Sequence, residues 1–379
     1  MSAGKRVTIK EIAAVSGTSI GTVDRALSDR PGINAETKAR VLEVARHLGY
    51  RPNQAASALS RRRPLKITVI YNTSQGTFFE ELDRGILQAA RELGDFGVEV
   101  ERLQSDRIDV GWQIQQLQNP RLRDSDAVLL NAAGQELEAA VNELSDQGVT
   151  VVTFNSDLPG SRRLFFVGND ARQSGALAAE LLAKLLDGQG RVMVLGNDLD
   201  NPASLARFRG FAETCAAEYP ELRQVSCRSC GGDPKLAEEI LAEQVRQQAV
   251  SGVFASSFSA TLGCCRYLHK LRARQLQPES EALPRLKIVG YDLSPDIQAA
   301  LQQDLCQAVL YQDPFNQSYQ ALRRLAAWLI EKQLPDPDSI LIETRILLRH
   351  NAARYLPGTE TRAHWAQPDT NPGQTSQTD

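Results

Sequence analysis

Residues 8–27 constrain the fold of this chain most, because they contain the signals for two short helices separated by a tight turn. Thr8 and Glu11 form a capping box, in which each side chain bonds to a free backbone N–H group at the start of a helix. Gly17 can adopt the positive φ that ends this helix, and Ser19 caps a second one. This pattern predicts a helix-turn-helix, whose second helix enters the major groove of DNA. An ordinary pair of packed helices is the alternative.

A third helix is expected over residues 33–48, so that residues 1–51 form a three-helix headpiece. Residues 52–64 follow as a linker, in which Asn53 caps one short helix that ends near Leu59. A helix of this length with so little apolar surface is not stable in isolation. We expect the linker to fold only on DNA, with Leu59 as an apolar wedge for the minor groove. A plain basic tether is the alternative.

The distribution of charge supports contact between this part and nucleic acid. Residues 1–66 contain about 13 Lys and Arg against about 5 Asp and Glu, a net charge of about +8. Because the whole chain has a net charge of −3, residues 67–379 have about −11. A basic segment joined to an acidic remainder is typical of a protein that binds DNA through one part only.

Residues 7–63 resemble the DNA-binding headpiece and hinge helix of the LacI/GalR family of bacterial transcription regulators. The motifs that carry the resemblance are Val7-Thr8-Ile9 with Ile12-Ala13, Gly17-Thr18-Ser19, Thr22-Val23 with Arg25, Gly49-Tyr50, Pro52-Asn53, and Ala56 with Leu59. The resemblance implies that the start of the second helix reads base edges and that the hinge leucine opens a base step. The implied DNA-binding residues are Thr8, Ser19, Ile20, Gly21, Thr22, Asp24, Arg25, Asn53, Ala56 and Leu59.

Two residues depart from the family pattern. Asp24 stands where the family usually has Ser, and Gly21 stands where a longer polar side chain often reads a base. A carboxylate beside DNA can accept from a cytosine amino group or orient Arg25. The operator sequence therefore stays open.

From residue 65 onward, apolar strand segments alternate with amphipathic helices, which predicts an α/β fold with parallel sheets and helices on both faces. So many strands suit two lobes better than one sheet. We expect the N-lobe to contain residues 65–167 and 294–312. The C-lobe would contain residues 168–293 and 313–350, including one strand over Ile340–Leu347. Ligands bind outside the carboxyl ends of such strands, so a site is expected between the lobes.

Residues 65–350 resemble the type I periplasmic sugar-binding fold that forms the effector domain of the same family. The matching motifs are Phe165-Phe166-Val167-Gly168-Asn169-Asp170 with Gly175, Arg207-Phe208-Arg209-Gly210-Phe211, Val289-Gly290-Tyr291-Asp292, and Gln312-Asp313-Pro314. The resemblance implies that Phe78 and Phe79 stack on a sugar ring, while Arg207, Asp292 and Gln312 bind its hydroxyl groups. Fork-shaped donors and a carboxylate suit neighbouring hydroxyls, and the C–H face of the ring suits an aromatic side chain.

The remaining effector residues implied are Asn155 and Ser257, and both depart from the family pattern. Asn155-Ser156, followed by Asp157, replaces an Asp-Arg pair that is frequent in pyranose binders, and Ser257 replaces a polar amide. A modified sugar, a polyol, a phosphosugar or another small polar metabolite therefore stays open as effector. Alternatives also stay open for single residues: Arg207 and Asp292 could form an interlobe ion pair, and Phe78 and Phe79 could be core.

Other functional classes lack their signals. Cys227 and Cys230 have the spacing of a zinc or redox pair, but no second pair of ligands stands at a matching distance, so neither metal nor cofactor is expected. The sequence has no phosphate loop and no nucleophile motif, which argues against an enzyme. It has no apolar run near the roughly 18 residues of a membrane span and no secretory signal, so we expect a cytoplasmic protein without membrane contact.

Residues 351–379 are polar and aperiodic and are expected to be a disordered tail.

These features predict a homodimeric transcriptional repressor that binds a near-palindromic DNA operator. Each headpiece would read one half-site, because one recognition helix reads too few bases for specificity. A small sugar or sugar derivative bound between the lobes would alter operator affinity through a coupling free energy. The alternatives are a regulator that responds to a non-carbohydrate metabolite and a cytosolic solute-binding protein.

Overall fold

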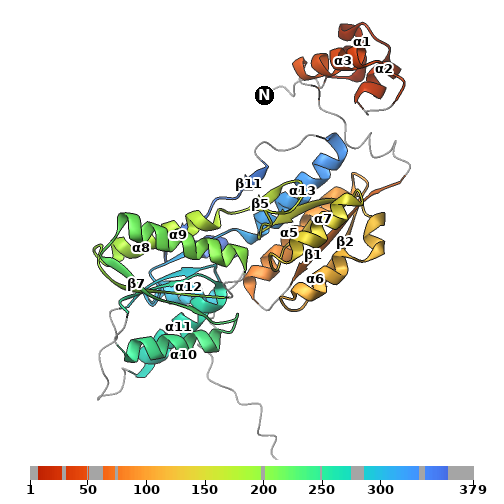
Figure 1. The fold of residues 1–379 in the computed structure, drawn as a ribbon. Coiled ribbons are helices and arrows are strands. Elements are labelled where there is room, and N and C mark those ends of the chain that lie inside the picture. Colours follow the sequence, from red (N-terminus) through yellow and green to blue (C-terminus); the bar gives the residue numbers. More distant parts are fainter. Residues whose placement is uncertain are drawn as a thin grey trace, which may run out of the picture. The chain divides into compact units, whose positions relative to one another are not determined.

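The computed structural model describes residues 7–27, 31–48, 50, 63–72, 76–197, 201–247, 250–274, 286–332 and 338–356. The chain consists of two units, residues 1–64 and residues 65–379. Figure 1 shows the small helical unit and the larger unit with its two sheets.

The first unit contains three helices: α1 (Ile9–Ser16), α2 (Ile20–Leu27) and α3 (Ala35–His47). The capping box is formed as predicted, since Thr8 N donates to Glu11 Oε2 at 2.7 Å and Glu11 N donates to Thr8 Oγ1 at 3.3 Å. Gly17 ends α1 with φ of 65°. Asn34 caps α3 by accepting from Thr37 N at 2.7 Å. One small core joins the three helices; it consists of Ile12, Ala13, Val23, Ala26, Val41 and Ala45.

The second unit has two six-stranded sheets, which define its two lobes. The sheet of the N-lobe has the order β11-β5-β4-β3-β1-β2, and all its pairs are parallel. Its strands are β1 (Leu65–Asn72), β2 (Val98–Ser105), β3 (Ala127–Leu130), β4 (Thr150–Phe154), β5 (Phe166–Gly168) and β11 (Ser339–Leu341). Its helices are α5 (Thr77–Gly94), α6 (Val110–Leu117), η1 (Pro120–Asp124), α7 (Leu137–Asp146) and α13 (Pro314–Glu331).

The sheet of the C-lobe has the order β12-β10-β9-β8-β6-β7, in which only the pair of β10 and β12 is antiparallel. Its strands are β6 (Gly190–Gly196), β7 (Leu222–Ser229), β8 (Gly252–Ala255), β9 (Lys287–Tyr291), β10 (Ala308–Tyr311) and β12 (Arg345–Leu347). Its helices are α8 (Ala171–Leu185), α9 (Pro202–Glu218), α10 (Pro234–Arg246), α11 (Phe258–Arg274), α12 (Pro295–Gln302) and η2 (Ala352–Tyr355).

Helices cover both faces of each sheet, as the alternation of strands and helices predicts (Figure 1). In the N-lobe, α5 and α13 pack on one face, where Ile67 and Val69 are buried, and α6 and α7 pack on the other, where Ile70 is buried. In the C-lobe, α8 and α9 cover the face of Val192, and α10, α11 and α12 cover the face of Met193. The α/β class with two mainly parallel sheets is confirmed.

The predicted division of the lobes was wrong after residue 293. The segment 294–312 belongs to the C-lobe, because β10 pairs with β9 and α12 packs in the same core. Helix α13 belongs to the N-lobe, because it buries Leu322 and Leu325 against β1, β3 and β4. The predicted strand over Ile340–Leu347 is two strands, of which β11 pairs with β5 and β12 with β10.

The chain therefore crosses between the lobes three times within the described residues. The first crossover joins β5 to α8 (residues 169–170), the second joins β10 to α13 (residues 312–313), and the third joins β11 to β12 (residues 342–344). The predicted tail over 351–379 also begins too early, because η2 buries Ala352, and Tyr355 packs against the C-lobe core. Residues 357–379 lie outside the described residues.

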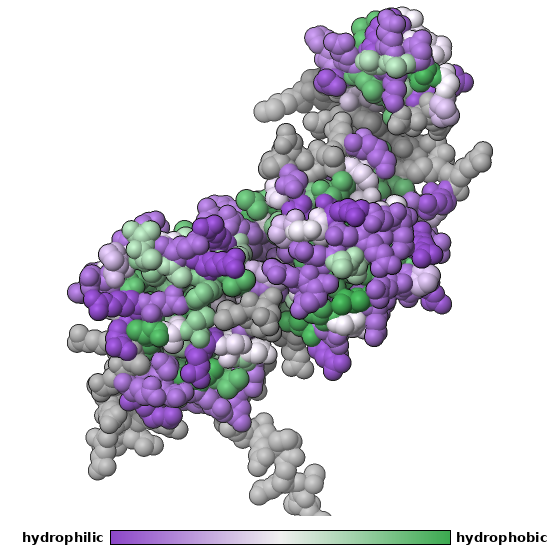
Figure 2. Space-filling model, viewed as in Figure 1, coloured by the Kyte–Doolittle hydropathy of each residue, from purple (hydrophilic) through white to green (hydrophobic). Residues whose placement is uncertain are grey.

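On the face shown in Figure 2, the described residues are mainly hydrophilic, and the hydrophobic ones form small separate groups. Among the described residues, no helix is both long and apolar enough to cross a bilayer.

Candidate functional site

The predicted DNA-binding residues of the headpiece divide into helix caps and exposed positions. Thr8 and Ser19 are caps; Ser19 Oγ accepts from Thr22 N at 3.1 Å and lies 2.9 Å from Thr22 Oγ1. Ile20, with half of its surface exposed, Gly21 and Arg25 lie open to solvent at α2. The exposed part of α2 thus begins at its first residue, as groove reading requires.

Asp24 is half-buried on α2. Burial of Tyr50, together with the negative charge of Asp24, raises the pKa of Tyr50. Asn53, Ala56 and Leu59 lie outside the described residues.

In the second unit, most of the predicted effector residues lie where strands end. Asn155 follows β4, Ser257 lies just beyond β8, Asp292 follows β9, and Gln312 follows β10. Asn155 and Asp292 have φ of 61° and 64°, a left-handed conformation that Asn and Asp tolerate better than other side chains. The chain turns sharply at these residues, so both side chains stand at the carboxyl edge of a sheet.

Arg207 comes to the same place from α9, and glycine makes this possible. A Cβ at Gly175 would lie 2.0 Å from the carbonyl oxygen of Arg207, and one at Gly210 would lie 1.9 Å from that of Arg172. Only glycine at these two positions lets the backbones of α8 and α9 touch. Arg207 is consequently buried, with 7% of its surface exposed.

Gln312 lies at the centre of the cluster. Its Nε2 donates to Asp292 Oδ1 at 2.9 Å, and its Oε1 accepts from Arg207 Nη2 at 3.4 Å and from Asn155 Nδ2 at 3.3 Å. Asn155 Nδ2 also donates to Gln317 Oε1 at 3.1 Å. Residues from the N-lobe, the C-lobe and the second crossover thus meet in one hydrogen-bonded group.

Arg207 and Asp292 both belong to the C-lobe, so they do not form the interlobe ion pair considered as an alternative. Burial raises the pKa of Asp292 to about 6, although the charge of Arg207 and the hydrogen bond from Gln312 lower it. Arg207 Nη1 donates to the carbonyl oxygen of Ser256 at 3.1 Å, while its Nε is buried without a hydrogen-bond partner. A buried donor without a partner costs free energy that a bound acceptor would recover.

The two predicted aromatic side chains of the N-lobe, Phe78 and Phe79, pack against each other, and one of them also packs against the core. Phe78 and Phe79 form an edge-to-face pair with ring centroids 5.0 Å apart, and Phe78 packs against the N-lobe core. Phe78 is therefore partly a core residue, which was the alternative to a role in effector binding. Opposite them, the ring of Phe258 from the C-lobe lies so close to Gly76 that a Cβ there would be 3.0 Å from it.

Several residues of this region were not singled out from the sequence. The ring of Tyr291 lies under the Arg207 guanidinium, with Cζ 4.0 Å from the ring centroid. Asn197, at the end of β6, accepts from Ser257 Oγ at 2.8 Å. Asn72, at the end of β1, is buried and its Oδ1 has no hydrogen-bond partner. A polar residue directly after each apolar strand was the signal that could have identified Asn72 and Asn197.

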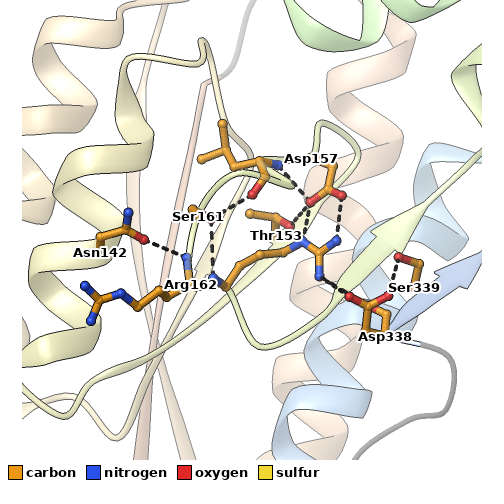
Figure 3. A network of polar contacts seen from close by, with 9 residues as sticks. Asn142, Thr153, Asp157, Ser161, Arg162, Asp338 and Ser339 are labelled. Carbon is orange, nitrogen blue, oxygen red and sulfur yellow. Dashed lines mark hydrogen bonds and ion pairs between the residues drawn. The ribbon is translucent and has the colours of Figure 1, made fainter.

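Asp157, which follows the Asn155-Ser156 pair, forms an ion pair with Arg163 (Figure 3). Arg163 donates to both of its oxygens, at 2.6 and 2.8 Å, and to Asp338 at 3.2 Å. Thr153 Oγ1 donates to Asp157 at 2.7 Å. Because Asp338 directly precedes β11, this network fastens the start of β11 to the loop between β4 and β5. Among the described residues, no group of His, Cys, Asp or Glu has the arrangement of a metal site.

The fold and the cluster define a two-lobed binding domain joined to a helix-turn-helix headpiece. Comparison with protein-family models agrees: the periplasmic binding protein domain matches residues 67–333, and the bacterial regulatory proteins of the lacI family match residues 8–53. The chain belongs to the LacI family and is a DNA-binding transcriptional regulator with a periplasmic-binding-protein domain. The matching curated proteins are regulators, not enzymes.

Individual relatives are more distant. The ribose operon repressor of Bacillus subtilis is 26% identical over 292 residues, which cover 76% of this chain and 82% of the relative. A solute-binding protein from Burkholderia graminis in complex with D-arabinose has a TM-score of 0.68 at 21% identity, covering 77% of this chain and 98% of that one. A glucose-galactose binding protein from Geobacillus stearothermophilus has a TM-score of 0.68 at 20% identity, with 76% and 99% covered. The two solved structures share the fold.

Proposed function

We propose that this regulator is a cytoplasmic, homodimeric repressor whose operator affinity is controlled by a neutral, sugar-like effector. The effector would bind at the cluster formed by Arg207, Asp292, Gln312 and Asn155. The observation that carries this proposal is the buried Arg207 side chain, whose Nε has no hydrogen-bond partner beside a buried carboxylate. A pair of neighbouring hydroxyl groups satisfies such a site, because each hydroxyl accepts from the guanidinium and donates to the carboxylate.

The charge of the cluster favours a neutral effector. Arg207 is its one cation and Asp292 its one anion among the residues described above, so no positive charge is left to balance a phosphate. An anionic group beside the buried carboxylate of Asp292 would be repelled in surroundings of low dielectric. Sugars and polyols are therefore favoured over sugar phosphates and sugar acids.

The relatives support the same class of effector. One regulator is named for the ribose operon, and the two solved proteins of the same fold are a D-arabinose complex and a glucose-galactose binder. A dimer is supported by the size of the headpiece, because the eight residues of α2 read only a few base pairs. Two headpieces on a near-palindromic operator would supply the specificity that one lacks.

The proposal is tested in two steps with the purified full chain. First, a thermal-shift panel of D-ribose, D-arabinose, D-glucose, D-galactose and myo-inositol is run beside the matching sugar phosphates and sugar acids. A ligand that binds only the folded protein raises the melting temperature by mass action. Second, an operator is selected from randomised duplexes, and its dissociation constant is measured with and without each ligand that binds.

We expect at least one neutral ligand to raise the melting temperature and change operator affinity by about fivefold or more, and the anionic ligands to do neither. Binding of the phosphates alone would reject a neutral effector. Operator binding that no ligand of the panel changes would reject a sugar-like effector.

A further inference from the structure

Four buried or partly buried polar side chains meet where two of the three crossovers pass each other. Asn169 Nδ2 lies within hydrogen-bond distance of Tyr291 OH (3.0 Å), Thr344 Oγ1 (3.0 Å) and Ser174 Oγ (3.2 Å). Ser174 Oγ lies 3.0 Å from Thr344 Oγ1, and Tyr291 OH donates to Ser174 Oγ at 3.3 Å. Such a connected network holds its members in one arrangement more firmly than separate pairs do.

The members of this network come from different parts of the fold. Asn169 lies on the first crossover and Thr344 on the third, while Tyr291 is the last residue of β9 in the C-lobe. A backbone hydrogen bond holds the third crossover next to the start of the first, since Ile342 N donates to the carbonyl oxygen of Gly168, the last residue of β5, at 2.6 Å. The Tyr291 hydroxyl is thus the point at which the C-lobe sheet holds both crossovers.

The other face of the Tyr291 side chain belongs to the effector cluster. The Arg207 guanidinium lies over its ring, with Cζ 4.0 Å from the ring centroid, which is a cation–π contact between two buried side chains. Arg207 also reaches Gln312 on the second crossover, and Gln317 Nε2 of α13 donates to the carbonyl oxygen of Gln312 at 2.7 Å. Arg207 therefore touches side chains that are anchored to all three crossovers.

We infer that Tyr291 is a positioning residue that couples the occupancy of the effector cluster to the arrangement of the crossovers. An acceptor bound to Arg207 Nε fixes the guanidinium over the ring, and the ring carries the hydroxyl that holds Asn169 and Ser174. Since the angle between the lobes depends on the crossovers, the occupied and empty sites favour different angles. This inference rests on the proposed function, because it assumes that Arg207 receives the effector.

The test uses Tyr291→Phe, which keeps the ring under Arg207 and removes only the hydroxyl. Tyr219→Phe is the matched control, because Tyr219 packs in the same C-lobe core at the end of α9, away from the crossovers. The neutral ligands of the panel that bind the wild type are titrated against both variants, and operator affinity is measured with and without each ligand.

We expect the ligand-induced change in operator affinity to fall below about twofold in Tyr291→Phe, when each protein is measured at a ligand concentration that saturates it. Tyr219→Phe should keep the full change. Full coupling in Tyr291→Phe would overturn the inference, and so would a loss of coupling that Tyr219→Phe shares.

A second measurement needs no ligand and separates this inference from the proposed function. Hydrogen–deuterium exchange is followed at the crossovers, above all at the Ile342 amide, in the ligand-free wild type and both variants. We expect about tenfold faster exchange at residues 168–170 and 342–344 in Tyr291→Phe only, with the strands of the C-lobe unchanged. Unchanged exchange, or faster exchange throughout the C-lobe sheet, would overturn the positioning role even if no ligand of the panel binds.

Discussion

The two lobes use the same alternation of strands and helices but present different chemistry at the carboxyl ends of their strands. The C-lobe supplies the charged pair, Arg207 and Asp292, together with the ring of Tyr291. The N-lobe supplies neutral amides, of which Asn155 is bonded to Gln312, and Asn72 keeps an unpartnered Oδ1. The same alternation thus places a charged pair on the C-lobe side of the proposed site and neutral amides on the N-lobe side.

This difference suggests a separate contribution of each lobe to effector binding. Buried charges must be held rigidly, and Arg207 is fixed by the contact of α8 with α9 and by the ring below it. The amides of the N-lobe need no counter-charge, so they can approach or leave the cluster at a lower cost in desolvation. We therefore expect the C-lobe to anchor the effector and the N-lobe to complete its coordination.

The largest effect is expected from Asp292→Asn, which keeps the shape of the side chain and removes its charge. The variant leaves Arg207 without a counter-charge and removes the acceptor for effector hydroxyls, so effector affinity should fall by about 100-fold. Isothermal titration calorimetry with a neutral ligand that binds the wild type measures it. Asp304→Asn is the control, since Asp304 is an exposed C-lobe residue with φ of 59°. An effect of less than about fivefold at Asp292 would remove the C-lobe from its anchoring role.

A smaller effect on stability is expected from Gly76→Ala, which tests the contact between the lobes. Gly76 has φ of 134°, and its added Cβ would lie 3.0 Å from the ring of Phe258. Strain and crowding together should lower the free energy of unfolding by about 2 kcal/mol, measured by urea denaturation. Gly94→Ala is the control, because no heavy atom lies within 4 Å of its Cβ position. In a Phe258→Ala background, Gly76→Ala should lower the free energy of unfolding by less than it does in the wild type. An equal loss in both backgrounds would show that backbone strain alone acts.

Asn155→Gly should weaken effector binding by about tenfold, because it removes a neutral donor but leaves the charged pair in place. Glycine accepts the φ of 61° at this position, whereas Asn155→Ala adds backbone strain of about 1 kcal/mol to the same loss. Calorimetry and urea denaturation of both variants separate the two contributions. A loss as large as that of Asp292→Asn would mean that the two lobes contribute equally.

The smallest effect is expected in the pH dependence of effector affinity, which follows from the Arg207–Asp292 pair. Burial raises the pKa of Asp292 to about 6, and the carboxylate form is the one that accepts from hydroxyls. Effector affinity should therefore fall by about twofold at pH 6 and more steeply below it, while Asp292→Asn should show no such change. The stability of the ligand-free domain should change in the opposite sense: it falls as pH rises from about 4 to 6, because the folded state holds the proton more tightly than the unfolded chain. Affinity that is constant from pH 5 to 8 would exclude Asp292 as the hydroxyl acceptor.

Signals that act over a few residues were sufficient to predict the headpiece and most of the strands. The capping box of Thr8, the positive φ of Gly17 and the cap at Ser19 each depend on three or four neighbouring residues, and all three are present in the structure. The alternation of strands and helices from residue 65 onward was predicted, because apolar runs alternate with amphipathic segments, and the structure has it in both lobes. Arg207, Asp292 and Gln312 were identified by resemblance to the family, and the structure brings them together.

The sequence by itself determined the helix-turn-helix, the alternation of strands and helices, and the residue types that gather at the site. Only the tertiary structure decided which lobe contains α12, β10 and α13, and it divided the expected strand at Ile340–Leu347 between two sheets. It also placed the Tyr291 side chain between Arg207 and the crossovers, and it paired Asp157 with Arg163. The physical reason is range: caps and periodic patterns are set by neighbours along the chain. Strand partners and buried polar contacts also join residues far apart in the sequence, such as Phe166 with Ser339 in the N-lobe sheet and Asn169 with Tyr291 at the crossovers.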